Sequence, residues 1–199
     1  PIEYELKKVS QKQISPWLDY ADLARAFLRM DPDVMLIGEV RDEVTADAIC
    51  RAASTGHLAL STLHTTDSLG TILRLYTLGM SREQVSNTLL GALAQRLVRR
   101  ICSSCVMEDK LTEKQAALLG ALAPKNPRRG AGCHRCHGTG YHGRVGVFEL
   151  FIVDHRVQDM IAEKSSMRQL REYAHGRGFK SLLHDALEKV EEGLTTVEE

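Results

Sequence analysis

The sequence predicts an α/β fold: a partial parallel sheet, then a cysteine-rich insert and a small helical C-terminal subdomain. Two short apolar segments, at residues 34–37 and 58–63, predict the strands of that sheet. A helical pattern at residues 43–55 lies between them. Buried apolar strands that alternate with helices are typical of parallel sheets. Two Cys-x-x-C pairs between residues 102 and 136 indicate the insert.

The composition is that of an ordinary globular chain of 199 residues, with 43% hydrophobic and 26% charged residues. The 26 basic and 26 acidic side chains cancel, so a general polyanion binder is not expected, and no nucleic-acid partner is predicted. The apolar runs fall short of the ~20 residues that cross a bilayer. The chain starts without Met and without a signal-peptide pattern, so we interpret it as a fragment of a longer protein.

Further helices in the first part of the chain are predicted at residues 19–30, 67–78 and 81–99. Asp67 and Ser81 are suited to begin the second and third, because their side-chain oxygens can accept hydrogen bonds from free amides at a helix N-terminus. The third helix is expected to run through the leucines that follow Ser81 toward Arg99.

The character of the sequence changes after residue 100, and three domains are expected: residues 1–100, 101–143 and 144–199. Thr112, followed three residues later by Gln, forms a capping-box pattern and predicts a helix inside the second domain. The third domain is expected to contain a strand at residues 144–150 and then three short helices.

Four of the five cysteines form two Cys-x-x-C pairs: Cys102 with Cys105, and Cys133 with Cys136. Each pair can direct two thiolates toward one Zn²⁺ ion from a tight turn, so the four are predicted to be metal ligands. Two disulfides or redox-active pairs are the alternative. The fifth, Cys50, lies in a helical pattern and is expected to be a small buried side chain.

Residues with potential chemistry follow each predicted strand. Glu39 comes directly after the first strand, where parallel strands present their ligand-binding edge. A carboxylate there can orient water or help to hold Mg²⁺ beside a triphosphate, although many strands simply end in Glu. His57 precedes the second strand, and His64 follows it in a hydroxyl-rich segment. That segment can contact a phosphate, or it can be a capped helix start with surface histidines.

These segments together resemble the motifs of the secretion ATPase superfamily. Asp31-Pro32-Asp33-Val34-Met35-Leu36-Ile37-Gly38-Glu39-Val40-Arg41-Asp42 resembles its Walker B segment, residues 55–65 its histidine box, and residues 94–99 its following helix. The similarity continues through both cysteine pairs, and Pro1-Ile2-Glu3 is similar to the end of its aspartate box. Over nearly its whole length the chain resembles the C-terminal part of GspE/PilB-like ATPases of type II secretion or type IV pilus assembly.

The resemblance implies a RecA-like motor domain, of which residues 1–100 form the latter half. It implies a homo-hexamer that hydrolyses ATP with Mg²⁺ and holds structural Zn²⁺. Glu39 would be the catalytic carboxylate, and His64, His57 and Arg41 the nucleotide-binding candidates. The protein would be cytoplasmic and peripheral to the bacterial inner membrane, associated through platform proteins of the secretion or pilus machinery. The four cysteines distinguish it from the retraction ATPases, which lack this module.

One motif of such an enzyme is absent from the sequence. The chain contains no G-x-x-x-x-G-K-[ST], the loop whose amides and Lys bind the phosphates. We therefore predict that this chain alone neither binds ATP tightly nor hydrolyses it.

Two functions of other classes stay open from the sequence. Residues 124–144 contain five basic residues and no acid, as a zinc-knuckle nucleic-acid module would. Their one aromatic residue, Tyr141, gives little capacity for base stacking. The zinc module can also be a non-catalytic interaction domain, whose basic loop contacts an acidic partner or anionic lipid headgroups. The motifs do not separate secretion from pilus assembly.

Overall fold

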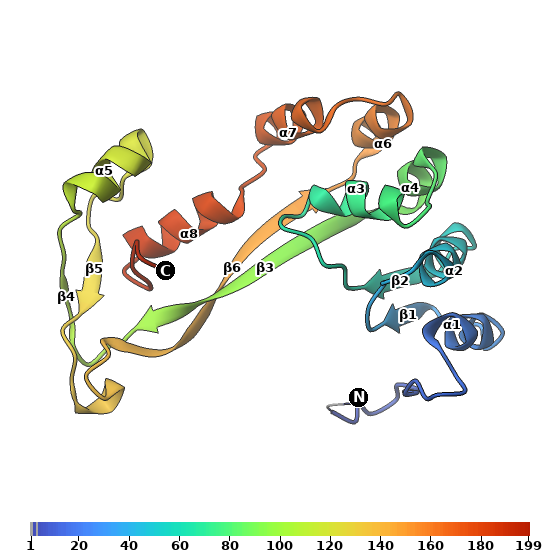
Figure 1. The fold of residues 1–199 in the computed structure, drawn as a ribbon, viewed down its shortest axis with the longest axis horizontal. Helices are drawn as coiled ribbons and strands as arrows, with labels where there is room; N and C mark the ends of the chain where they lie inside the picture. Colours follow the sequence, from blue (N-terminus) through green and yellow to red (C-terminus); the bar gives the residue numbers. More distant parts are fainter. Residues whose placement is uncertain (1, 3) are drawn as a thin grey trace. The chain divides into compact units, whose positions relative to one another are not determined.

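The computed structural model describes residue 2 and residues 4–199. Pro1 and Glu3, part of the predicted aspartate-box end, lie outside the described residues. The chain forms two compact units: Pro1–Leu90 with Ile152–Leu170, and Gly91–Phe151 with Arg171–Glu199. Figure 1 labels their helices and strands. The three-domain division stays a prediction.

The first unit is built on a parallel pair of strands, as predicted. Strand β1 (Val34–Ile37) pairs with β2 (Leu58–Ser61) in parallel, with Ile37 opposite Ser61. Helices α1 (Tyr20–Leu28) and α2 (Glu43–Ser54) accompany them (Figure 1). Their packed core is small, and its buried members are Ala24, Met35, Ile37, Ala48 and Ala52.

The expectation that these strands are buried throughout is wrong. Met35 and Ile37 are buried, but the alternating residues Val34 and Leu36 are 54% and 70% exposed. Side chains alternate between the faces of a strand, and within the described residues α1 and α2 cover one face of this sheet. An all-apolar segment therefore has one apolar face open.

The rest of this unit is helical and consists of α3 (Gly70–Thr77), α4 (Arg82–Thr88) and α6 (His155–Ala162). Ser81 begins α4 with a complete capping box, as predicted. Helix α3 starts at Gly70, three residues after Asp67, although the Asp67 carboxylate still accepts its amide at 2.7 Å.

The predicted helix from residue 81 to 99 is wrong in its second half. Helix α4 ends at Thr88, Leu89 is extended, and strand β3 (Gly91–Ile101) follows. Leu, Ala, Gln and Arg in this segment all favour helix locally. Pairing of β3 with β6 (Tyr141–Ile152) overrides that preference. The segment similar to the family's helix is thus a strand.

The second unit contains the long β3–β6 ribbon, whose arrows point in opposite directions in Figure 1. Strands β4 (Val106–Glu108) and β5 (Arg128–Gly130) form a small antiparallel pair. Helix α5 (Glu113–Leu119) begins at the Thr112 capping box, as predicted. Short 3-10 turns lie at Gly120–Leu122 and His134–Cys136.

The three predicted C-terminal helices are present as α6, α7 (Met167–Gly176) and α8 (Leu182–Glu191). Helix α8 and strand β6 exchange hydrogen bonds between backbone and carboxylate. The Phe148 amide donates to Asp185 at 2.7 Å, and the Leu182 amide donates to buried Glu149 at 3.1 Å. Among the described residues, no helix is both long and apolar enough to cross a membrane.

Candidate functional site

The backbone around Glu39 is held by the segment that leaves β2. The Thr62 hydroxyl donates to the Gly38 carbonyl at 2.6 Å, and the Val40 amide donates to the Thr62 carbonyl at 3.0 Å. The Ser61 hydroxyl donates to the last carbonyl of β1 at 2.7 Å. Glu39 therefore lies between two peptide groups that both bond to Thr62.

Three of the four candidate nucleotide-site residues meet at this position. Arg41 Nε lies 2.6 Å from Glu39 Oε2, and His64 Nε2 lies 3.6 Å from the same oxygen. The Glu39 side chain is 22% exposed, whereas those of Arg41 and His64 are 69% and 80% exposed. The arrangement places one carboxylate beside two nitrogen groups at the carboxyl end of parallel strands, where ligands of α/β sheets bind.

Asp42, the next acid, has a structural task. It begins helix α2: its carboxylate accepts the Thr45 amide at 2.8 Å and the Thr45 hydroxyl at 3.1 Å. These bonds compensate a free helix amide and fix the chain just after Arg41. Glu39 is consequently the carboxylate that faces the other polar groups.

His57 is not brought to this cluster. Its Nδ1 lies 3.0 Å from the Thr55 hydroxyl and 3.0 Å from the Ala52 carbonyl, at the C-terminus of α2. It precedes β2, whereas His64 follows it. The four strand residues at about 3.3 Å each separate the two histidines by more than ~13 Å along the strand.

The sequence alone does not predict the task of Ser61 and Thr62. In the sequence their hydroxyls belong to a polar segment that can contact phosphate. In the structure the Ser61 hydroxyl donates to the Ile37 carbonyl at the end of β1, and the Thr62 hydroxyl donates to the carbonyl of Gly38, the next residue. Their position in the sequence could have indicated these bonds, because hydroxyls at the end of one parallel strand lie beside the end of the neighbouring strand.

The four paired cysteines form one cluster. Their sulfur atoms all lie within 4.8 Å of one another. The Sγ–Sγ distances are 3.8 Å for Cys102 with Cys133, 3.9 Å for Cys105 with Cys136, and 3.7 Å for Cys133 with Cys136. Four sulfurs at the usual Zn–S distance of about 2.3 Å on a tetrahedron are ~3.8 Å apart. The cluster therefore fits one Zn²⁺ ion.

Backbone amides stabilise negative charge on one sulfur of this cluster. The amides of Cys133 and Gly140 donate to the Cys136 sulfur at 3.1 and 3.3 Å. The Cys133 amide is the larger cause that lowers the pKa of the Cys136 thiol to about 6, and so favours the thiolate that binds metal. Burial raises the pKa of Cys105 to about 11, a cost that a bound cation offsets. Cys50 is 6% exposed, as expected for a buried thiol.

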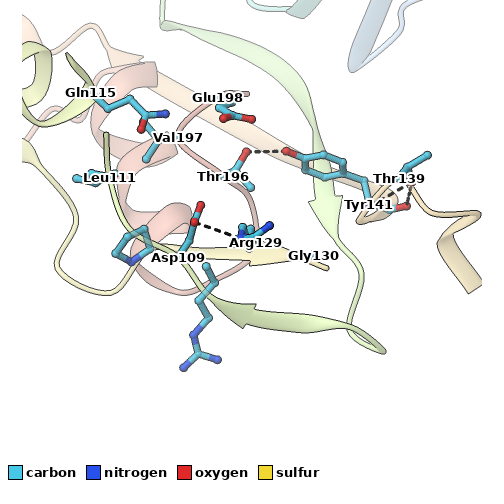
Figure 2. Close-up of a pocket in the computed structure, with 12 residues that line it drawn as sticks. Asp109, Leu111, Gln115, Arg129, Gly130, Thr139, Tyr141, Thr196, Val197 and Glu198 are labelled. Atoms are coloured by element: carbon cyan, nitrogen blue, oxygen red, sulfur yellow. Dashed lines mark hydrogen bonds and ion pairs between the residues drawn. The ribbon is translucent and has the colours of Figure 1, made fainter. Parts of the chain in front are cut away.

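A polar pocket of about 240 Å³ lies in the second unit and contains none of the predicted site residues. Figure 2 shows interactions among its lining residues. The Tyr141 and Thr196 hydroxyls share a hydrogen bond at 2.8 Å, and Arg129 pairs with Asp109 at 3.3 Å. Because this guanidinium is already neutralised, the pocket offers less free positive charge for an anion than its composition suggests.

Comparisons with known proteins match the whole chain to the family that its sequence motifs resemble. A family model described as "Type II/IV secretion system protein" matches residues 1–199. Type II secretion system protein E of Pseudomonas aeruginosa is 43% identical over 203 residues, which cover all of this chain and 40% of that protein. The type IV pilus assembly ATPase PilB of Thermus thermophilus is 41% identical over 205 residues, covering all of this chain and 23% of that protein.

A solved structure extends this similarity to the fold. The crystal structure of the pilus retraction motor PilT with bound ADP matches 90% of this chain and 42% of its own, with a TM-score of 0.63 at 27% identity. The chain thus spans less than half the length of these relatives. The resemblance to GspE/PilB-like ATPases is confirmed, and the chain belongs to the type II/IV secretion system protein family.

Proposed function

We propose that the protein containing this chain is a motor ATPase that powers type II secretion by pseudopilus assembly. The observation that carries this proposal is the meeting of Glu39, Arg41 and His64 at the carboxyl end of the β1–β2 pair. Glu39 and His64, which come from the segments that resemble the Walker B and histidine-box motifs, are 25 residues apart in the sequence. In the structure, His64 and Arg41 nevertheless lie beside the same carboxylate oxygen of Glu39.

Each side chain has a distinct task in this proposal. The Glu39 carboxylate orients the attacking water and accepts its proton, a general-base role that contributes roughly 10²- to 10⁴-fold to rate. His64 and Arg41 are placed to contact phosphate oxygens, because both nitrogen groups are exposed beside Glu39. ATP with Mg²⁺ is the expected substrate complex. His57 has the weakest support, since it lies at the other end of β2.

The wider assembly belongs to the same proposal. The α/β sheet is interpreted as the latter half of a RecA-like domain that works as a homo-hexamer. Its partners are platform proteins of the bacterial inner membrane, with which it associates peripherally from the cytoplasm. The support is the family and the ATPases among the relatives.

The cysteine cluster is proposed to hold Zn²⁺ in a structural role. Four thiolates complete a tetrahedral shell and leave no open position for a substrate. The ion would connect the turn after β3 to the turn before β6, which are far apart in sequence.

Glu39→Gln in the full-length protein tests the catalytic assignment. The amide is nearly isosteric but cannot accept the proton, so phosphate release should fall by about 10²-fold or more while ATP still binds. Glu163→Gln is the matched control, because Glu163 forms an exposed ion pair with Arg156 at 3.8 Å in the same unit. Turnover of the Glu39 variant at the wild-type rate would remove the basis of the proposal.

Type IV pilus assembly is the second candidate, because the PilB relative is nearly as similar as the secretion protein. Deletion of the gene separates the two. Retention of exported proteins inside the cell indicates secretion, whereas loss of surface pili with normal export indicates pilus assembly.

A further inference from the structure

We propose that Thr62 is a positioning residue that holds Glu39 against His64, a role that rests on the proposed ATPase function. Thr62 leaves β2 two residues before His64, and it bonds to the backbone on both sides of Glu39. One residue thereby connects the two loops that supply the site.

The contacts are specific to this position. The Thr62 hydroxyl donates to the Gly38 carbonyl at 2.6 Å, and the Thr62 carbonyl accepts the Val40 amide at 3.0 Å. The second contact continues the backbone pairing of β1 with β2 beyond Ile37 and Ser61, where the regular register ends. The first contact uses a side chain, so only Ser or Thr can supply it with this geometry.

The hydroxyl is needed because the residue before Glu39 is glycine. Gly38 has no Cβ to restrict its backbone, so the peptide group that leads into Glu39 has more conformational freedom than at any other residue type. The bond to its carbonyl removes that freedom. The Ser61 hydroxyl, 2.7 Å from the Ile37 carbonyl, gives the same support one residue earlier.

This orientation matters for Glu39 because its carboxylate must stay within reach of two groups. Glu39 Oε2 lies 2.6 Å from Arg41 and 3.6 Å from His64. Displacement of a catalytic group by about 1 Å can cost 10²-fold in rate. Loss of the hydroxyl should therefore lower kcat far more than it lowers stability, since Thr62 itself is exposed.

The test compares three variants of the full-length protein: Thr62→Val, Thr62→Ser and Thr77→Val. Valine keeps the shape and removes the hydroxyl, and serine restores it. Thr77 is the matched control, because its hydroxyl also donates to a backbone carbonyl, that of Arg74 at 2.8 Å, from an exposed position in the same unit. The measurements are kcat and KM for ATP and the hydrogen exchange of residues 36–42.

For Thr62→Val we expect kcat to fall by roughly 10- to 100-fold with KM changed less than about 2-fold. Amide exchange over residues 36–42 should become about 10-fold faster, because one hydrogen bond is lost. Thr62→Ser and Thr77→Val should stay near wild type in all three measurements.

Each contrary result has its own meaning. If hydrogen exchange of residues 36–42 is unchanged in Thr62→Val, the hydroxyl does not hold the Glu39 segment. If exchange is faster but kcat is normal, holding this segment does not affect catalysis. Either result overturns the proposal. Thr62→Ser as slow as Thr62→Val also overturns it. A wild-type protein without ATP hydrolysis refutes the proposed function, while the exchange data still decide whether Thr62 holds the Glu39 segment.

Discussion

Asp185 shows how the position of a single carboxylate changes its chemistry. Its side chain is 19% exposed, and it accepts hydrogen bonds from the Phe148 amide and, at 2.5 Å, from the Lys189 ammonium. Burial raises the pKa of Asp185, but Lys189 and the Phe148 amide together outweigh burial and lower it below the ordinary value. The charged form is thus favoured in the folded protein, where it connects α8 to β6.

Asp185→Asn should destabilise the protein at pH 7 by about 1–2 kcal/mol, because the Phe148 amide and Lys189 lose a charged partner. For a domain of this size that corresponds to a fall in Tm of roughly 4 °C. Because the pKa of Asp185 is lower in the folded than in the unfolded protein, its ionised carboxylate stabilises the folded state at pH values above the unfolded pKa of about 3.9. This stabilisation is lost as the pH falls through the folded-state pKa. The difference in Tm between wild type and variant should therefore be constant from pH 7 to about 5 and should decrease as the pH is lowered to 3.

Calorimetry across this pH range makes the comparison, with Asp159→Asn as the control. Asp159 is an exposed aspartate on α6, so its replacement should change Tm little at any pH. A difference for Asp185→Asn that persists undiminished at pH 3 contradicts the charge-based explanation.

At the scale of elements, local residues decide where a helix begins, whereas pairing with a distant strand decides whether a segment becomes a strand. Ser81 and Thr112 begin helices where the sequence predicts them, because capping boxes involve residues only three positions apart. Strand β3 has helix-favouring composition, yet it pairs with β6, about 50 residues later. Long-range pairing of this kind leaves no local pattern in the sequence.

The cysteine module gives the prediction at this scale. Removal of metal by a chelator should release about one Zn²⁺ per chain and increase hydrogen exchange within residues 101–143, because the four sulfurs would lose their common ligand. Exchange in β1 and β2 should stay unchanged, since they belong to the other compact unit. Metal content and exchange mass spectrometry measure both effects.

Two cysteine variants make this test specific. Cys133→Ala should lose the metal, whereas Cys50→Ala should keep it, because Cys50 is a buried thiol outside the cluster. Disulfides in place of metal, the alternative from the sequence, would instead give a chain without zinc whose mass shifts on reduction.

At the scale of the whole chain, the sequence lacks one motif that the proposed ATPase function requires. Glu39, Arg41 and His64 form a cluster, but the chain contains no P-loop sequence to hold the phosphates. It also spans only 23% and 40% of the two relatives compared above. We therefore expect tight nucleotide binding only in a longer protein that supplies such a loop.

The purified 199-residue chain should accordingly show no ATPase activity above background and no tight binding of labelled ATP. The full-length protein, assayed in parallel, should show both. Phosphate release by the short chain at the rate of the full-length protein would contradict this prediction and would require phosphate-binding groups within residues 1–199.

The sequence by itself determined the family, the parallel strand pair and the four-cysteine cluster, and it placed Glu39 and His64 after the two strands as site candidates. These depend on short motifs and on one general property of parallel sheets, whose strand ends meet at a common edge. Only the tertiary structure showed that residues 91–101 form a strand, that His57 lies away from the cluster, and that Thr62 bonds to both sides of Glu39. The physical reason is that these features depend on hydrogen bonds and register between segments far apart in the chain, and local residue preferences carry no information about which distant backbone group will be the partner.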